Sequence, residues 1–283
     1  MKKILIQLDT DPHPSTFDRV VAIDAGVEAL FSYGGITPDN VTGLVHGGMF
    51  TRGPQDLRNT ALFIGGSNVD AGEALLRKVR KAFFGPVRMS VMIDSNGSNT
   101  TAAAAVRAAA KHLTLKDVDA LVLGGTGPVG HRAAPILSSL GARVHVGSRA
   151  KERAEQTCSA IREVVPDAHL EACGQEESAE RLKQCQLVIA AGAAGVQFFA
   201  EPDWTSSPSL KVAIDLNAVP PAGLEGIGMT DKAVQKGEIV CYGAIGVGGT
   251  KMKIHKAAVA KLFEQNDQIL DTAAIYRIAE SLG

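Results

Sequence analysis

Leu121-Val-Leu-Gly-Gly-Thr-Gly-Pro-Val-Gly130 is an apolar run that passes into a glycine-rich turn. Residues 120–123 predict a buried strand, and the residues after the turn predict a helix. Within the turn, Gly125 permits a tight bend, Gly127 lets the backbone approach a pyrophosphate, and Gly130 lets the helix pack closely on the strand. The candidate nucleotide contacts are therefore Gly125, Thr126, Gly127, Pro128, Val129 and Gly130. Together they predict a dinucleotide-binding α/β domain with a parallel sheet.

The residues after the next strand, at 143–147, bear on the choice of cofactor. A site for NAD usually carries an Asp or Glu about 20 residues after the glycines, where it accepts hydrogen bonds from the ribose. This chain has Ser148, Arg149 and Lys151 there. A hydroxyl can donate to a 2′-phosphate and two cations can neutralise it, so the residues favour NADP, with NAD as an alternative. An ordinary solvated turn that opens a helix would also explain them.

Composition and charge narrow the class of protein. The chain has 283 residues, 45% of them hydrophobic, which suits two domains with sizeable cores. A formal charge of −1 gives no field that would attract nucleic acid or an anionic membrane. The four cysteines form no CxxC pair, which predicts buried free thiols in a reducing compartment. The N-terminus is too polar for a signal peptide and the histidines lack metal-ligand spacing, so we expect a cytoplasmic protein without a metal.

Apolar runs alternate with helical patterns along the whole chain. Strands are predicted at 4–8, 61–65, 88–93, 187–190, 211–215 and 238–242, and helices at 15–30, 71–84, 100–111, 252–265 and 271–282. We expect an N-terminal α/β domain over residues 1–112 and a Rossmann-type domain over 113–267, with the C-terminal helix at 268–283 packed back on the first domain.

A polar turn lies where the strand at 88–93 gives way to a helix. Its sequence is Asp94-Ser-Asn-Gly-Ser-Asn-Thr-Thr101. Polar groups at such a turn naturally face a ligand, although an elaborate helix cap would explain them equally. The candidate substrate contacts are Asp94, Asn96, Ser98, Asn99 and Thr100.

A second glycine run, residues 243–249, precedes Lys251, Lys253 and His255. We expect a flexible loop that opens a helix. Cations at a helix N-terminus are disfavoured by the helix dipole, so their placement indicates an anionic or electron-rich ligand near Lys251. In the nucleotide-binding half, Ala191 and Asn217 follow buried strands and are further candidate cofactor contacts.

Five segments resemble the NAD(P)-dependent methylene-tetrahydromethanopterin dehydrogenases of bacterial one-carbon metabolism, some relatives of which also use methylene-tetrahydrofolate. These are residues 10–18, 94–103, 124–130, 217–223 and 243–251. The resemblance implies an N-terminal pterin-side domain, a Rossmann-type NADP domain, a cleft between them and a homo-oligomer. It also implies that Lys251 is the catalytic candidate. Asp18 could accept a bidentate hydrogen bond from the amino-pyrimidinone edge of a pterin, although an acid early in a helix also complements the dipole.

The implied reaction is oxidation of N5,N10-methylene-tetrahydromethanopterin by direct hydride transfer. The methenyl cation that forms spreads its charge over two nitrogens, so no general base is needed. Alignment of the methylene carbon with the nicotinamide and exclusion of water suffice. A methylene-tetrahydrofolate dehydrogenase and a non-catalytic NADP- or pterin-binding protein remain alternatives. Cyclohydrolase activity is not expected, because the Tyr-x-x-x-Lys of bifunctional folate enzymes reads Tyr33 to Thr37 here. A shikimate-dehydrogenase-like enzyme would pair a lysine with an aspartate, and Asp94 has no lysine partner in the sequence.

Overall fold

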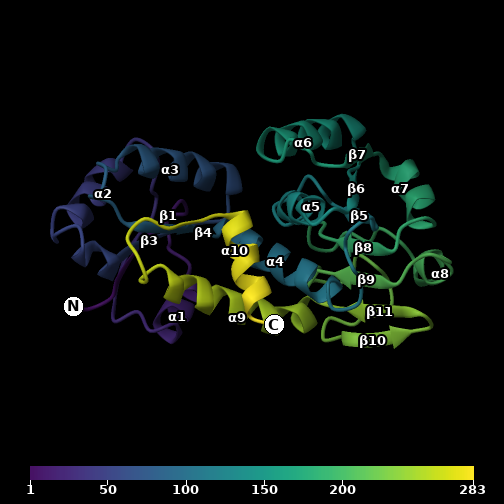
Figure 1. Ribbon diagram of the computed structural model, residues 1–283. Coiled ribbons are helices and arrows are strands. Elements are labelled where there is room, and N and C mark those ends of the chain that lie inside the picture. The colour runs from purple at the N-terminus through teal and green to yellow at the C-terminus, as the bar shows by residue number, and fades with distance from the viewer. The chain divides into compact units, whose positions relative to one another are not determined.

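The computed structural model describes all 283 residues, and they divide into two compact units. The first unit comprises residues 1–100 and 252–283, and the second comprises residues 101–251. These bounds differ from the expected 1–112 and 113–267, because they fall inside two continuous helices, α4 (Ser98–Ala109) and α9 (Ala244–Lys261). Figure 1 labels most helices and strands of the two units, which are described separately below.

A five-stranded parallel sheet forms the centre of the first unit. Its strands are β1 (Ile4–Asp9), β2 (Ala29–Tyr33), β3 (Thr60–Gly65), β4 (Ser90–Ile93) and β12 (Ile269–Leu270), in the order β12-β4-β3-β1-β2. Its further helices are α1 (Thr16–Asp24), α2 (Val41–Met49), α3 (Val69–Lys81) and α10 (Thr272–Ser281), with short 3-10 turns at Asp56–Asn59 and Ser95–Gly97. The carboxyl ends of β1, β3 and β4 are therefore neighbours, which is where ligands bind in open parallel sheets.

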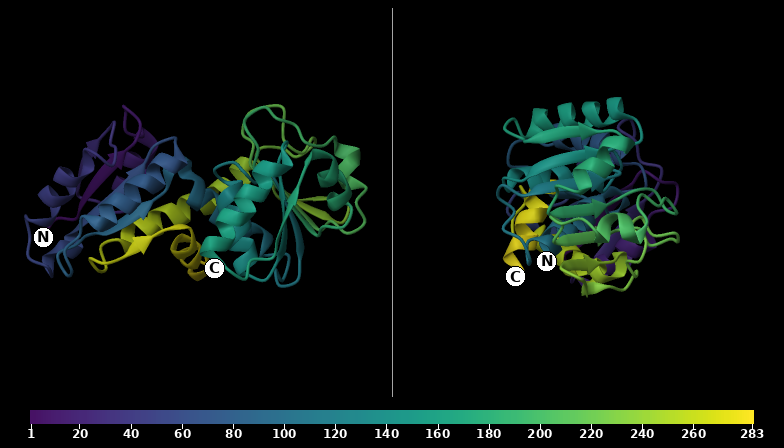
Figure 2. Two further views of the ribbon diagram at one scale, coloured as in Figure 1. Left: turned by 90° about the horizontal axis from the view of Figure 1, so that it is seen from above. Right: turned by 90° about the vertical axis from the view of Figure 1, so that its right-hand side faces the viewer.

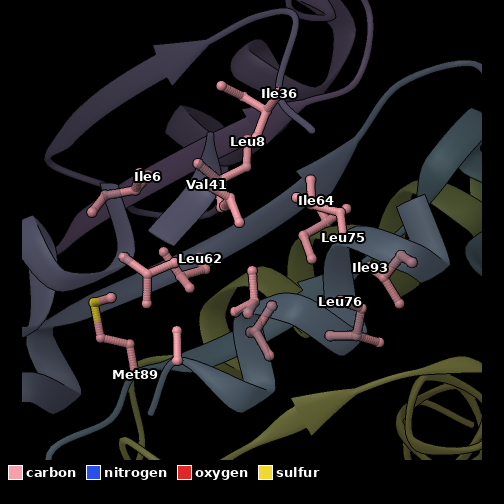
Figure 3. Packing of buried hydrophobic residues seen from close by; sticks show 14 of the residues in the cluster. Ile6, Leu8, Ile36, Val41, Leu62, Ile64, Leu75, Leu76, Met89 and Ile93 are labelled. Atoms are coloured by element: carbon pink, nitrogen blue, oxygen red, sulfur yellow. The ribbon is translucent and has the colours of Figure 1, made fainter. Parts of the chain in front are cut away.

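The core of the first unit lies between this sheet and the helices α2 and α3. Leu8 of β1, Leu62 and Ile64 of β3 and Ile93 of β4 lie with Leu75 of α3 in one apolar cluster (Figure 3). Every residue of β3 is buried, as expected for a central parallel strand that is covered on both faces.

The predicted helix at 15–30 is wrong in its second half. The helix α1 ends at Asp24, the chain turns at Gly26 with a φ of 91°, and the edge strand β2 follows. A positive φ is the conformation that glycine supplies after a helix end. Neighbouring strand β1 then pairs with all of β2, so a tertiary contact decides the structure of residues 29–33.

A seven-stranded sheet forms the second unit. Its strands are β5 (Asp119–Leu123), β6 (Arg143–Gly147), β7 (Leu170–Cys173), β8 (Leu187–Ala190), β9 (Val212–Asp215), β10 (Lys232–Lys236) and β11 (Ile239–Tyr242), in the order β10-β11-β9-β8-β5-β6-β7. All pairs are parallel except the edge pair β10 and β11. The predictions of parallel strands at 143–147 and 187–190 are confirmed residue for residue.

Helices cover both faces of this sheet (Figures 1 and 2). They are α5 (Gly130–Ser139), α6 (Lys151–Val164), α7 (Gln175–Leu182) and α8 (Glu201–Thr205). The strand order reverses at β5, which lies between β6 and β8. The glycine-rich turn after β5 is therefore at the topological switch point of a doubly wound sheet, and the predicted Rossmann-type fold is confirmed.

The second glycine run is helical rather than a flexible loop. Helix α9 begins at Ala244, and the amide of Ile245 donates to the carbonyl of Met229 at 2.8 Å. A Cβ at Gly246 would lie 1.7 Å from the carbonyl oxygen of Asp231. Glycine is therefore required there for backbone packing, and the resulting contacts offset its low helix propensity.

All four cysteines are free and buried, as the sequence predicted. Burial raises the pKa of the Cys185 thiol to about 12 and that of Cys241 to about 11. None of the helices combines the length and the apolar character that a membrane-spanning helix needs.

Truncation of the first unit's core should be costly. Leu62→Ala removes a side chain that is 0% exposed on a central strand, so we expect a loss of about 2–5 kcal/mol in the free energy of unfolding. The urea midpoint, followed by circular dichroism, measures it. Val20→Ala, on the exposed face of α1, is the control and should change the midpoint little. A similar small effect of both variants would contradict the packing described here.

Candidate functional site

The turn between β5 and α5 is tight because glycines bring backbone against backbone. A Cβ at Gly130 would lie 2.5 Å from the carbonyl oxygen of Gly124, and one at Gly125 would lie 2.6 Å from Cγ1 of Val146. Gly124, which precedes the predicted motif, adopts a φ of 67°. The sequence motif located the bend, but the left-handed residue is one position earlier than expected.

The central glycine of the motif lines a cradle that a Cβ would narrow. A Cβ at Gly127 would meet the carbonyl oxygens of Gly124 at 3.2 Å and of Ala191 at 3.6 Å. Ala191 itself is tied to the sheet, because its amide donates to Leu123 at 2.9 Å. Of the remaining turn residues, Pro128 is exposed, and Thr126 and Val129 are half-buried. This cradle, followed at once by the start of α5, fits the pyrophosphate of a dinucleotide.

The candidate 2′-phosphate contacts follow β6. Ser148 is half-buried and Arg149 is exposed, whereas Lys151 is the first residue of α6. The ammonium of Lys151 lies 2.5 Å from Oε1 of Glu177, and this hydrogen bond raises the pKa of the lysine. Glu177 also accepts a hydrogen bond from the amide of Gly174 at 2.9 Å. One of the two expected cations is therefore already paired with a carboxylate that the sequence analysis did not single out.

Asn217 lies in a loop that its own side chain holds together. Its amide group donates to the carbonyl of Pro221 at 2.9 Å, and its side-chain oxygen accepts from Val219 at 3.0 Å. Asp215, at the end of β9, accepts from the amides of Asn217 and Leu224, both at 2.9 Å. Burial raises the pKa of Asp215, and these amides counteract the shift. The polar atoms of Asn217 shape this loop, which begins at the carboxyl end of the sheet.

In the first unit, the polar turn after β4 forms an internal network. The carboxylate of Asp94 accepts from the hydroxyl of Thr100 at 2.6 Å and from its amide at 3.1 Å. The hydroxyl of Ser98 donates to the carbonyl of Ser95 at 2.8 Å. Asp94, Ser98 and Thr100 are all buried. They provide the capping network that starts α4, which was one of the two explanations left open by the sequence.

The two asparagines of this turn differ in environment. Asn99 is buried, donates to the carbonyl of Ile93 at 2.7 Å and accepts from the hydroxyl of Thr272 at 2.6 Å. Asn96 is exposed and adopts a φ of 55°. The sequence could not separate them, because Thr272 lies far along the chain in α10.

Asp18 lies in the first turn of α1, near a second carboxylate. The helix is capped by Ser15, whose hydroxyl accepts from the amide of Asp18 at 3.2 Å. A Cβ at Gly65 would lie 3.1 Å from Oδ2 of Asp9 and 3.6 Å from Oδ2 of Asp18. Both carboxylates therefore reach the end of β3. Asp9 was missed as a site residue, although it ends an apolar strand just as Asp94 does.

His255 lies close to the same sheet edge. Its ring stacks on that of Phe63 with centroids 5.7 Å apart, and Nδ1 lies 3.9 Å from Oδ2 of Asp94. The ring of Phe17 makes a tilted contact at 6.2 Å. The first unit thus gathers Asp9, Asp18, Asp94 and His255 around the carboxyl ends of its central strands.

Lys251 lies inside α9, well past the N-terminus of that helix at Ala244. The expectation that it opens a helix is therefore wrong, and the argument from an unfavourable dipole does not apply to it. His255 follows one turn later on the same face, because residues four apart are neighbours on a helix.

Comparison with known proteins shows the family of this chain. The family model for the N-terminal part of methylene-tetrahydromethanopterin dehydrogenase matches residues 16–96. The chain is 41% identical to the bifunctional protein MdtA of Methylorubrum extorquens, over 99% of both chains. It is 33% identical to the NAD(P)-dependent methylenetetrahydromethanopterin dehydrogenase of the same organism, over 98% of both chains.

Solved structures agree in fold. Quinate dehydrogenase from Corynebacterium glutamicum in complex with NAD is 12% identical, covers 99% of both chains and gives a TM-score of 0.57. At that identity the likeness shows the fold alone. The two sequence relatives match nearly the whole chain, at 41% and 33% identity. The chain therefore belongs to the methylene-tetrahydromethanopterin dehydrogenase family.

Proposed function

We propose that the chain is an oxidoreductase that converts N5,N10-methylene-tetrahydromethanopterin to its methenyl cation with NADP as the preferred acceptor. The observation that carries this proposal is the similarity, over 98% of both chains, to a protein named for that activity. The glycine cradle after β5 supports the dinucleotide acceptor independently, because side chains at Gly125 and Gly130 would collide with their neighbours and prevent the tight turn that this binding needs.

When bound, the nicotinamide supplies a two-electron acceptor for the hydride. The protein then has to bind the substrate and the dinucleotide, align their reacting atoms and exclude water from them. The turn from Gly125 to Gly130 and the start of α5 would hold the pyrophosphate. Ser148 and Arg149 follow β6, where the adenosine ribose lies in this fold, and Arg149 would neutralise a 2′-phosphate.

The residues around the carboxyl ends of the first unit's strands would hold the pterin. Asp18 can accept two hydrogen bonds from an amino-pyrimidinone edge, since it is half-buried and its carboxylate reaches the end of β3. Exposed Asn96 can contact substrate directly. Asp94, Ser98, Asn99 and Thr100 act differently: their hydrogen bonds fix the turn that presents Asn96.

Lys251 would orient the substrate. Its ammonium donates hydrogen bonds only, so it would bind an oxygen or nitrogen acceptor of the pterin ring. No proton has to leave the methylene carbon, so the reaction does not require Lys251 as a base. Its contribution is then positional, and misplacement of reacting atoms by about 1 Å costs on the order of 100-fold in rate.

The proposed activity can be tested by following NADP+ reduction with methylene-tetrahydromethanopterin. We expect rapid turnover by the wild-type chain and a loss of about 100-fold in kcat/KM for Lys251→Ala. Lys253→Ala, an exposed cation on the same helix, is the matched control and should retain activity.

Parallel assays with methylene-tetrahydrofolate and NAD+ test the substrate and the acceptor. Equal or faster folate turnover would replace the proposed substrate by the folate derivative. Binding of dinucleotide without turnover of either pterin would refute the dehydrogenase and leave a binding protein.

The two asparagines of the polar turn should separate stability from substrate binding. Asn99→Asp places an acceptor against the carbonyl of Ile93, so the free energy of unfolding should fall by about 1–3 kcal/mol. Asn96→Gly removes the amide but suits the positive φ of 55° at this position, so it should change the urea midpoint little and raise KM for the pterin. If Asn99→Asp is as stable as the wild type, or Asn96→Gly has an unchanged KM, the division of roles proposed here is wrong.

A further inference from the structure

Two helices of the second unit meet beside the edge strand β7. Helix α6 begins at Lys151 after β6, and α7 begins at Gln175 after the parallel strand β7, so both N-termini lie at the carboxyl edge of the sheet. The pair of Lys151 and Glu177 joins these helices at 2.5 Å. A pocket of about 610 Å³ runs from this pair along α6, β7 and α7.

Glu177 is held in place from two sides. One oxygen accepts from Lys151 and the other from the amide of Gly174. These two hydrogen bonds are the first causes that lower the pKa of Glu177, so its carboxylate is charged at neutral pH. Both side chains of the pair remain close to half exposed, which leaves the pair accessible to a ligand.

A further carboxylate near this pair adds negative charge around Lys151. Glu155, one turn further along α6, also raises the pKa of Lys151. The nearest further cation on α7 is Arg181, and its guanidinium is engaged with Glu171 at 2.8 Å. The charge of Lys151 is therefore largely compensated within the protein.

We propose that Glu177 is a specificity-determining residue that engages Lys151 and so limits the preference of this chain for NADP over NAD. The proposal rests on the proposed function and refines its cofactor. A dinucleotide-binding site for NAD usually places its acid at the end of the second strand, where this chain has Ser148. Here the acid comes from α7 instead and acts on the cation beside the ribose.

The physical consequence concerns the 2′-phosphate alone. A dianionic phosphate near Lys151 has to displace or tolerate the carboxylate of Glu177, whereas the uncharged 2′-hydroxyl of NAD meets no such cost. Arg149, exposed and in the preceding turn, is then the main cation for the phosphate in the wild-type chain.

Dissociation constants for NADP+ and NAD+, measured by calorimetry on the full chain, test this inference. Glu177→Gln keeps an oxygen for the amide of Gly174 but removes the charge. We expect NADP+ to bind about fivefold more tightly and NAD+ to change less than twofold, the size expected for an exposed charge pair. Glu180→Gln is the matched control, since Glu180 lies on the same helix and pairs with Lys183 at 2.9 Å. Its affinity ratio should equal that of the wild type.

A double-mutant cycle with Lys151→Ala identifies the residue through which Glu177 acts. We expect this substitution to weaken NADP+ binding by about fivefold in the Glu177→Gln background and by less than twofold in the wild-type background. Circular dichroism confirms that each variant is folded. An unchanged NADP+ to NAD+ ratio in Glu177→Gln, or an equal effect of Lys151→Ala in both backgrounds, would overturn the inference.

These outcomes are distinct from failure of the proposed function. If the wild-type chain binds both dinucleotides and the ratio of the NADP+ and NAD+ dissociation constants is unchanged in Glu177→Gln, the role proposed for Glu177 is wrong. The dehydrogenase proposal is unaffected by that result. If the wild-type chain binds neither dinucleotide, both proposals fall.

Discussion

Direct contact between backbone segments, with no Cβ between them, is the constraint on which the nucleotide-binding unit depends. At Gly130 the helix α5 touches the carbonyl of Gly124, and at Gly246 the helix α9 lies against Asp231. The first contact places a helix start next to the switch point of the sheet, and the second sets where the helix with Lys251 begins. Any larger side chain at either position would move a whole helix, because protein interiors have little free space to absorb the change.

The elements that the sequence predicted well are those with a strong local signal. The runs at 143–147 and 187–190 are strands with those bounds, since both are short and contain the valine and isoleucine residues that favour strands. Residues 29–33 and 243–249 were misjudged for a common reason. Pairing with β1 makes the first an edge strand, and packing on the 228–231 loop makes the second a helix. In each case the partner is another segment of the chain, so the local propensity of residues 29–33 or 243–249 could not identify it.

The sequence identified polar residues of the candidate site, but not which of them hydrogen-bond within the protein and which remain exposed. The sequence indicated that residues 94–101 are polar and lie at a strand end, and the structure agrees. It could not indicate that Asn99 is held by Thr272 or that Lys151 is paired with Glu177, because each partner is on another element. A polar side chain can contact a ligand only if the fold leaves its polar atoms accessible. This is a property of tertiary structure rather than of the motif.

The burial of every thiol affects how this chain would tolerate reactive carbonyl compounds. Adducts with aldehydes form through the thiolate at an accessible sulfur, and the raised pKa values of the four cysteines keep them protonated at neutral pH. A protein whose proposed substrate carries a labile one-carbon unit at the oxidation level of formaldehyde thereby presents no cysteine nucleophile to it. The apolar packing that stabilises the second unit also acts as chemical protection.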